Sequence, residues 1–302
     1  MQADLPLGIV LPPIGVPVRS IGGHTFDFSR QIAVMAIVNR TPDSFFDQGS
    51  TFALDRAVAA AVQAARDGAD WVDIGGAPFA PGPEVPLAEE LDRVIPVIEG
   101  LTAESDVVIS VDTFRPEVAA AAIAAGASVI NDTTGIHDPR LADVVADSAA
   151  TLVITHSLAQ PRQAYPRPQY GDVAGEISDF LRSRIELARS RGIPDERIIL
   201  DPGHDLNKNT RQTLELTRRF DEIAALGFPA LAAVSNKDFV GESLGRDKAD
   251  RLAGSLAAAT VSVLLGARIV RMHDVAAAVD AMRMVESILG WREPVYETHN
   301  LG

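Results

Sequence analysis

Three polar residues stand at the ends of apolar runs, and turn-forming residues follow soon after each. The runs are VVISVD, ending at Asp112, ASVIN, ending at Asn131, and RIILD, ending at Asp201. A buried carboxylate or carboxamide is costly without a partner, and backbone N–H groups at the strand ends are one candidate partner. The equivalent positions favour another interpretation, in which the three side chains meet at one mouth of a parallel barrel. There, two carboxylates and a carboxamide suit a flat heterocycle with a guanidine-like, N–H-rich edge.

Cationic residues follow two later apolar runs. Lys237 lies in SNKD (235–238), and Arg271 and His273 lie in RMHD (271–274). Single surface lysines and arginines are usually only solvated. Loops after the last two strands of a parallel barrel often hold a phosphate, however, and these side chains supply the necessary donors. The clustering therefore predicts a phosphate site.

Two irregular loops follow the first two apolar runs. The first, VNRTPDSFFDQGS (38–50), has the composition of an ordinary loop, but it also suits an active-site flap. In that interpretation Asn39 is an oxygen ligand for Mg²⁺ and phosphate, and Asp43 and Asp47 face the same site. The second loop, DIGGAPFAPGPE (73–84), has no side chain between Asp73 and Glu84 that handles phosphate or protons.

Eight apolar runs alternate with eight helical patterns, after a predicted hairpin over 18–29 that turns at Gly22-Gly23. The predicted strands span 33–39, 70–76, 107–112, 127–132, 151–157, 197–203, 229–237 and 267–274. The predicted helices span 54–67, 87–103, 116–125, 139–148, 173–191, 209–225, 248–265 and 275–288. This order predicts an α/β fold, a TIM (β/α)8 barrel with an N-terminal β-hairpin. We expect one domain over 1–302, with the barrel core at about 33–290. A doubly wound open sheet is the alternative, weakened because no G-x-G-x-x-G follows the first strand.

Composition limits the classes of function. The chain has 302 residues, 47% of them apolar, a net charge of −14 and no cysteine. The negative charge argues against nucleic acid or an anionic membrane as a partner, and the missing cysteines exclude thiolate chemistry. The proline-interrupted N-terminus and the lack of a long apolar run lead us to expect a cytoplasmic protein without a membrane span. His156, His204 and His273 fall near strand ends, but neither an H-x-H after the first strand nor an H-E-x-x-H occurs, which disfavours a zinc hydrolase.

These motifs together resemble those of the dihydropteroate synthases, the pterin-binding TIM barrels of folate synthesis. They are N-x-TPDSF at 39–45, D-I-G-G at 73–76, S-V-D-T at 110–113, I-N-D at 130–132, D-P-G at 201–203, S-x-K at 235–237, G-S-L-A at 254–257 and R-x-H-D at 271–274. In that family the enzyme joins p-aminobenzoate to 6-hydroxymethyl-7,8-dihydropterin diphosphate and releases pyrophosphate. The resemblance implies that the pterin is bound by Asp112, Asn131, Asp201 and Lys237. It further implies that Asn39, Arg271 and His273 hold the diphosphate and its Mg²⁺, with Asn39 as the metal ligand.

The departures from the family pattern fall together. Where the family continues D-x-G-G with E-S-T-R, this chain has Ala77, Pro78, Phe79 and Ala80. Where the family has S-R-K-S, Asn236 replaces the arginine and Asp238 replaces the serine that receives the aminobenzoate carboxylate. An aspartate there would repel a carboxylate. The glycine-rich stretch after D-P-G has become His204-Asp205-Leu206-Asn207, and Arg40 replaces a small apolar residue.

Several functions remain open. The chain resembles the divergent second copy of actinobacteria, so we expect a homologue with little or no synthase activity and a vestigial pterin and diphosphate pocket. The alternatives are an active synthase with rearranged acceptor recognition, another transferase that uses the same pterin floor, and a non-catalytic regulatory or assembly protein. The TPDSF loop argues against a methyltetrahydrofolate-to-corrinoid transferase.

The resemblance also implies a homodimer, because the family commonly pairs through helices near the C-terminus. The Ala-rich stretch 252–266, with Gly254 and Gly266, suits close helix packing.

Overall fold

Eight parallel strands close into a barrel in the computed structural model, which describes residues 10–40, 50–159, 162–165 and 167–300. Neighbouring strands follow one another along the chain, and the last pairs with the first. The predicted TIM barrel is thereby confirmed. The strands are β3 (Ala33–Asn39), β4 (Trp71–Gly75), β5 (Val108–Asp112), β6 (Val129–Asp132), β7 (Thr151–Thr155), β8 (Ile198–Asp201), β9 (Ala230–Ala232) and β10 (Ala267–Met272).

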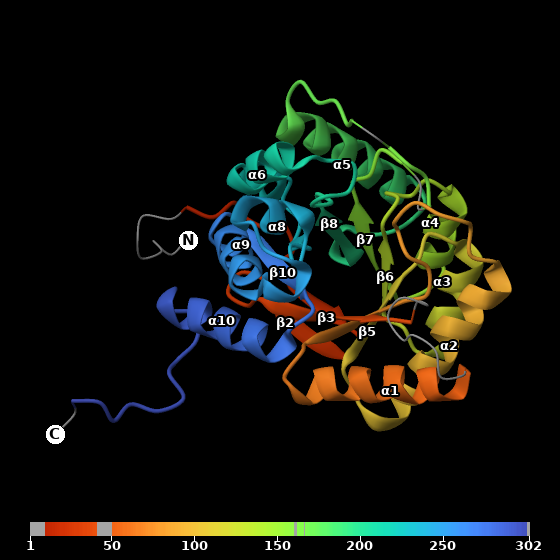
Figure 1. Cartoon of the computed structure of the whole chain (residues 1–302), viewed down its shortest axis with the longest axis horizontal. Helices are drawn as coiled ribbons and strands as arrows, with labels where there is room; N and C mark the ends of the chain where they lie inside the picture. Colours follow the sequence, from red (N-terminus) through yellow and green to blue (C-terminus); the bar gives the residue numbers. More distant parts are fainter. Residues whose placement is uncertain (1–9, 41–49, 160–161, 166, 301–302) are drawn as a thin grey trace.

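Helices surround this barrel and cover its outer face (Figure 1). They are α1 (Ser50–Arg66), α2 (Leu87–Glu104), α3 (Pro116–Ala125), α4 (Pro139–Ala146), α5 (Val173–Ser190), α6 (Thr210–Arg218), α7 (Phe220–Ala224), α8 (Asp238–Leu244), α9 (Leu252–Leu264) and α10 (Val275–Ile288). Several begin with local signals that the sequence carries. Pro116 opens the first turn of α3, and the side chains of Asp172 and Asp274 cap α5 and α10 by accepting backbone N–H groups.

Alternation along the strands divides the apolar residues into two cores. Outward-facing residues pack against the helices, whereas inward-facing residues such as Met35, Trp71 and Val108 fill the lower barrel. The predicted hairpin, β1 (Val18–Ile21) and β2 (His24–Asp27), places Phe26 against this inner group, 5.6 Å from the Trp71 ring between centroids. The hairpin therefore contributes to the inner core at the end of the barrel where the strands begin. The opposite mouth is left for polar side chains.

Two predicted elements differ from the structure. The expected helix 209–225 is broken at Arg219, whose φ of −112° and ψ of 28° separate α6 from α7. Neither glycine nor proline marks this break, and it directs α7 against α5. The expected strand 229–237 ends at Ala232, and the short helix α8, which the sequence did not predict, follows it. Asn236, four residues after the end of β9, has a left-handed φ of 55°, which is incompatible with the extended strand expected through residue 237.

In the part of the chain that the structure describes, no helix is long and apolar enough to cross a membrane.

Candidate functional site

A buried carboxylate, Asp73, organises the centre of the mouth. It projects inward from β4 and is fully buried. Its Oδ1 accepts a hydrogen bond from Ser110 Oγ at 2.6 Å, and its Oδ2 accepts one from Asn131 Nδ2 at 3.1 Å. Arg271 Nε lies 2.7 Å from Asp73 Oδ2, while Arg271 Nη2 lies 3.3 Å from Asp112 Oδ2. One carboxylate thus connects side chains from β5, β6 and β10.

The residues predicted to bind the pterin lie at the same mouth. They include acceptor oxygens that can still accept hydrogen bonds. Asn131 is only 2% exposed, and its Oδ1 has no hydrogen-bond partner among the described residues. Asp201 accepts the Gly203 N–H at 2.7 Å through Oδ1. Burial raises the pKa of the Asp201 carboxyl to about 6, and the Gly203 N–H and the charge of Lys237 oppose this rise. Burial also raises the pKa of Asp112, against the charge of Arg271. These buried acceptors suit a ligand that donates N–H groups.

A cationic cavity lies beside these acceptors. It has a volume of about 220 Å³, and Asn39, Lys237, Lys248, Arg271 and His273 are among its lining residues. No carboxylate is among the described residues that line it, and neither lysine forms an ion pair with a described carboxylate. In a chain with a net charge of −14, such a cavity is a local concentration of positive charge, which suits an anion.

Neighbouring segments position both His273 and Asn39: the stretch after β9 contacts His273, and β4 lies against Asn39. Ser235 Oγ accepts the His273 backbone N–H at 3.1 Å and lies 3.0 Å from its Nδ1. Burial, together with the charges of Arg271 and Lys248, lowers the pKa of His273 to about 4, so its ring is neutral near pH 7. Asn39 ends β3, and a Cβ on Gly75 would come within 2.7 Å of its Oδ1. Glycine at 75 therefore makes room for the carboxamide.

The side of the mouth where α8 begins carries Asp238 in an exposed position. Its side chain is 84% exposed and lies 3.1 Å from the Arg251 guanidinium. Arg251 Nη1 also donates to the backbone oxygens of Asn236 and Lys237, at 2.9 and 3.2 Å. The arginine is thus committed to the start of α8, and the group presented to solvent there is a carboxylate. An anionic acceptor at this position meets repulsion.

The loop after β4 is attached to the loop after β7 rather than to the mouth. Arg162 N donates to Phe79 O at 3.0 Å, and Gly82 N donates to Arg162 O at 3.1 Å. The Arg162 guanidinium also donates to the backbone oxygens of Ala80 and Pro83. Ala77 and Pro78 are half-buried and bring no polar side chain to this loop. The segment 77–80 thus serves as backbone scaffold and offers no side chain for a diphosphate.

The other two strand-end histidines are not among the described residues that line the cationic cavity. His156 is buried, and its Nδ1 lies 3.0 Å from Lys208 Nζ. His204 is fully buried and stacks on the Phe220 ring, with 6.0 Å between centroids. Burial lowers the pKa of both imidazoles. Over the described ranges, no three His, Cys, Asp or Glu side chains are grouped to hold a metal ion.

The first loop also contains Arg40, Asp43 and Asp47, and the structure describes only the first of these three. Asp43 and Asp47 lie outside the described residues. Arg40 is 8% exposed, and its Nη1 donates to Asp92 O at 2.7 Å, so it contacts the backbone of α2.

The sequence did not single out two important residues of the mouth. Asp73 appeared only as part of a motif, because every residue of β4 is buried and no polar alternation marks the face that points inward. Lys248 lies in a short 3-10 turn, over Lys248–Asp250, where a helix was expected to begin, so no pattern marked it.

Comparison with known proteins gives consistent relationships. The family model described as "Pterin binding enzyme" matches residues 35–273. The chain is 44% identical to a Mycobacterium tuberculosis protein named "Inactive dihydropteroate synthase 2", over 89% of this chain and 86% of that protein. It is 38% identical to the dihydropteroate synthase of Synechocystis sp., over 91% of this chain and 96% of that enzyme.

Solved structures show the same relationship. The Xanthomonas albilineans dihydropteroate synthase is 41% identical and covers 90% of this chain and 98% of its own. Its TM-score is 0.84 for the structure with 4-aminobenzoic acid and 0.81 for the complex with 7,8-dihydropteroate. With the barrel, the polar mouth and these matches in agreement, the chain belongs to the dihydropteroate synthase family of pterin-binding enzymes.

Proposed function

We propose that this protein binds a pterin and a diphosphate group at the barrel mouth, but joins the pterin to p-aminobenzoate very slowly or not at all. One observation carries the proposal. The polar residues at the strand ends converge on the mouth, whereas the segments at 77–80 and 236–238 lack the side chains that the family uses for diphosphate departure and acceptor binding.

On the pterin side, Asp112, Asn131 and Asp201 would accept N–H groups of the heterocycle, and Lys237 would donate. A buried acceptor without a partner costs roughly 1–3 kcal/mol, which a ligand N–H at Asn131 Oδ1 would recover. Burial also lowers the pKa of Lys237, against the charges of Asp205 and Asp201. A desolvated lysine beside buried carboxylates is suited to a specific polar ligand rather than to bulk water.

On the diphosphate side, Arg271 and His273 would contact the phosphate oxygens. The described hydrogen bonds of Arg271 use Nε and Nη2, which leaves Nη1 for an anion. Asn39 Oδ1 fits a magnesium ion as one oxygen ligand, provided that diphosphate oxygens and water complete the shell. The ion would neutralise charge on the departing diphosphate. We therefore expect Mg²⁺ to bind together with the diphosphate and not by itself.

Synthase activity requires more than the residues that would bind the pterin and the diphosphate. In this family, two loops must order around the diphosphate, and an anionic acceptor must dock near α8. Here the second loop has only Ala, Pro and Phe at 77–80, and Asp238, which is exposed at the start of α8, would face the acceptor. The loss of one preorganised electrostatic contact typically slows an enzyme by ~10²–10³-fold. Several losses acting on one step support turnover at least ~10³-fold below that of a family synthase.

The test measures dihydropteroate formation from both standard substrates, with a family synthase as the positive control. We then restore the family side chains with Ala77→Glu, Pro78→Ser, Phe79→Thr, Ala80→Arg, Asn236→Arg and Asp238→Ser. The restored variant should gain measurable turnover, because the residues proposed to bind the pterin are already present in the barrel. Adding Lys237→Ala to that variant should abolish the gain, which excludes a contaminating synthase as its source. Near-normal turnover by the unmodified protein contradicts the proposal.

Specific observations favour two other functions, an active synthase and a non-catalytic protein. The 38% identity to the Synechocystis enzyme, over nearly its full length, favours an active synthase with changed acceptor recognition. The name of the M. tuberculosis relative favours a non-catalytic role. Calorimetry with a pterin and with pyrophosphate measures binding, and the assay of dihydropteroate formation measures turnover. Binding without turnover excludes the active synthase and leaves the vestigial or regulatory interpretation.

A further inference from the structure

A second cavity opens beside the mouth, between α1 and the start of α10. Its volume is about 580 Å³, within the range of about 300–1,000 Å³ typical of ligand sites. Its lining includes Ile37, Ser235, Asn236, Lys248 and His273, all of which also line the cationic cavity at the mouth. The two cavities are therefore neighbours that share a wall. We call the larger one the side groove.

Small apolar side chains form much of the side groove. Ala36 and Val38 come from β3, and Ala60 and Ala64 come from α1. The last two are four residues apart, so they lie on one face of their helix. Larger residues at these positions would fill the space between the helix and the strand. The alanines thus leave an apolar channel next to the anion-binding cations.

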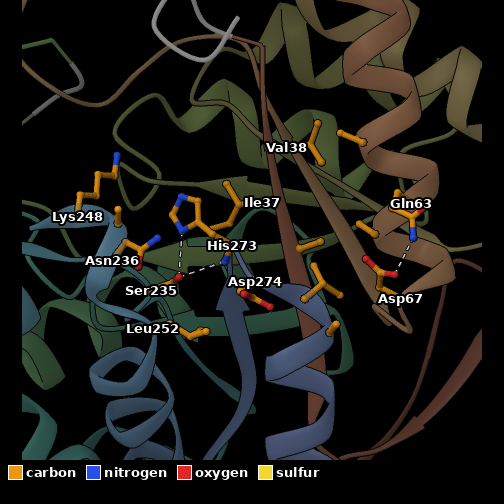
Figure 2. A pocket seen from close by; sticks show the side chains of 16 residues that line it. Ile37, Val38, Gln63, Asp67, Ser235, Asn236, Lys248, Leu252, His273 and Asp274 are labelled. Carbon is orange, nitrogen blue, oxygen red and sulfur yellow. Dashed lines mark hydrogen bonds between the residues drawn. The ribbon is translucent and has the colours of Figure 1, made fainter.

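The two ends of the side groove differ in charge. Figure 2 shows Lys248, Asn236 and His273 together at one end, and Gln63 and Asp67 at the other. Gln63 Nε2 donates to Asp67 Oδ1 at 2.7 Å, which fixes a carboxylate there. Asp274 also lines the groove next to His273, and its Oδ1 accepts the Ala277 N–H at 3.1 Å as the cap of α10. A molecule that follows the groove should therefore be anionic where it meets the lysine and arginine side chains of the mouth, apolar along β3 and α1, and without negative charge at its far end.

We propose that the site accepts an organic phosphate or diphosphate whose phosphate lies among the cations of the mouth and whose uncharged apolar extension lies in the side groove. This inference deepens the proposed function, since it rests on anion binding at the mouth and adds a ligand class. Asp238, at the start of α8, is not among the lining residues of the side groove. The extension leaves the mouth between β3 and β10 instead, past the wall formed by Ile37 and His273.

Graded probes test the inference by calorimetry. They are inorganic pyrophosphate, methyl diphosphate, hexyl diphosphate, and a six-carbon diphosphate that ends in a carboxylate. Each methylene that enters the groove should tighten binding by about two- to fourfold, from the transfer free energy of a buried CH₂. The terminal carboxylate should remove most of this gain, because Asp67 lies at the far end. Lys248→Gln should weaken all four probes.

A pair of matched variants separates the groove from non-specific binding. Ala60→Trp places a bulky ring in the groove from an exposed position on α1, and Ala59→Trp places the same ring on the same helix outside the lining. Ala60→Trp should abolish the gain from the hexyl chain and leave pyrophosphate affinity unchanged, and Ala59→Trp should change neither.

The failures of the two proposals are distinguishable. If pyrophosphate binds but the hexyl chain adds nothing, or if its gain survives Ala60→Trp, the inference about the groove is overturned and the mouth site stands. If no phosphate probe binds while a free pterin does, the groove inference falls together with the diphosphate half of the proposed function. If neither pterin nor any phosphate binds, the proposed function fails as a whole.

Discussion

At the scale of single residues, Asp73 controls the geometry of the mouth. It is fully buried and receives Ser110, Asn131 and Arg271. Removing one partner of a buried ion pair typically costs about 3–5 kcal/mol, so Arg271 is held firmly while Asp73 is present. The position of Arg271 beside Asp112 follows from this contact. Asp73, which was not among the residues predicted to bind a ligand, thus sets the positions of two that were.

Asp201 gives a prediction that links stability to function. Burial raises the pKa of the Asp201 carboxyl from 3.8 to about 6, so the folded state holds a proton more tightly than the unfolded state. The contribution of this group to stability is then fully present below about pH 4 and is lost as the pH rises through about 6. Asp201→Asn keeps an acceptor for the Gly203 N–H and removes the buried charge. Relative to wild type, it should gain about 1–3 kcal/mol in free energy of unfolding at pH 7.5 and little at pH 4.

Urea unfolding at the two pH values measures this difference. The same variant should lose pterin binding, since a charge-assisted hydrogen bond contributes roughly 1.5–3 kcal/mol. An equal stability change at both pH values would show that the charge of Asp201 is not the cause. Unchanged pterin affinity would remove Asp201 from the binding site.

At the scale of elements, the loop between β8 and α6 carries polar side chains where the family pattern is rich in glycine. These side chains form hydrogen bonds to two neighbouring segments. Asp205 and Asn207 have left-handed φ values of 63° and 52°, which Asp and Asn tolerate better than most residues. Asn207 Oδ1 accepts Ser157 Oγ and the Leu158 N–H, both at 2.8 Å. Asp205 Oδ2 accepts the Phe239 N–H at 3.2 Å, at the start of α8. The loop thus joins the β7 loop to α8.

Substitutions at Asn207 separate the effect of its backbone conformation on stability from the effect of its side-chain hydrogen bonds. Asn207→Gly keeps the left-handed conformation and loses the hydrogen bonds, whereas Asn207→Ala loses both. We expect Ala to be less stable than Gly by about 1 kcal/mol, from the cost of a left-handed Cβ. Both variants should increase amide exchange at Leu158 and Ala159, whose N–H groups lose their acceptor. Equal stability of the two variants would mean that the backbone at 207 relaxes out of this conformation.

At the scale of the whole molecule, neighbouring helices α9 and α10 expose apolar side chains. Val261, Met284 and Ile288 are 44%, 56% and 54% exposed. Both glycines of 252–266 allow close packing within the chain itself. A Cβ on Gly254 would come within 2.6 Å of Leu244, and one on Gly266 within 2.4 Å of Ala224. The exposed apolar side chains of the two helices form a surface that a second copy could cover.

We predict a homodimer through this surface of α9 and α10. Met284→Asp should convert the dimer to a monomer, because a charge would be buried without a partner at the interface. Val295→Asp is the control, since Val295 is 87% exposed and lies beyond the last helix. Light scattering over micromolar concentrations measures the mass of each protein. A monomeric wild type, or a dimer that persists in Met284→Asp, would contradict the predicted interface.

The sequence by itself determined the barrel, because eight apolar runs alternating with helical patterns leave few other architectures. It also determined which strand ends carry polar side chains, since Asp112, Asn131 and Asp201 each interrupt an apolar run. It revealed the departures at 77–80 and 236–238, although not that β9 ends at Ala232 and that α8 begins at Asp238, two residues after the left-handed Asn236.

Only the tertiary structure decided which side chains meet. Every residue of β4 is buried, so no polar alternation in the sequence could show that Asp73 faces inward. Its partners lie 37, 58 and 198 residues away along the chain, and barrel closure alone brings them together. The side groove has the same origin, since the space beside Ala60 and Ala64 depends on how far α1 stands from α10 and β3. Such distances are set by the packing of the whole barrel, which local sequence patterns do not encode.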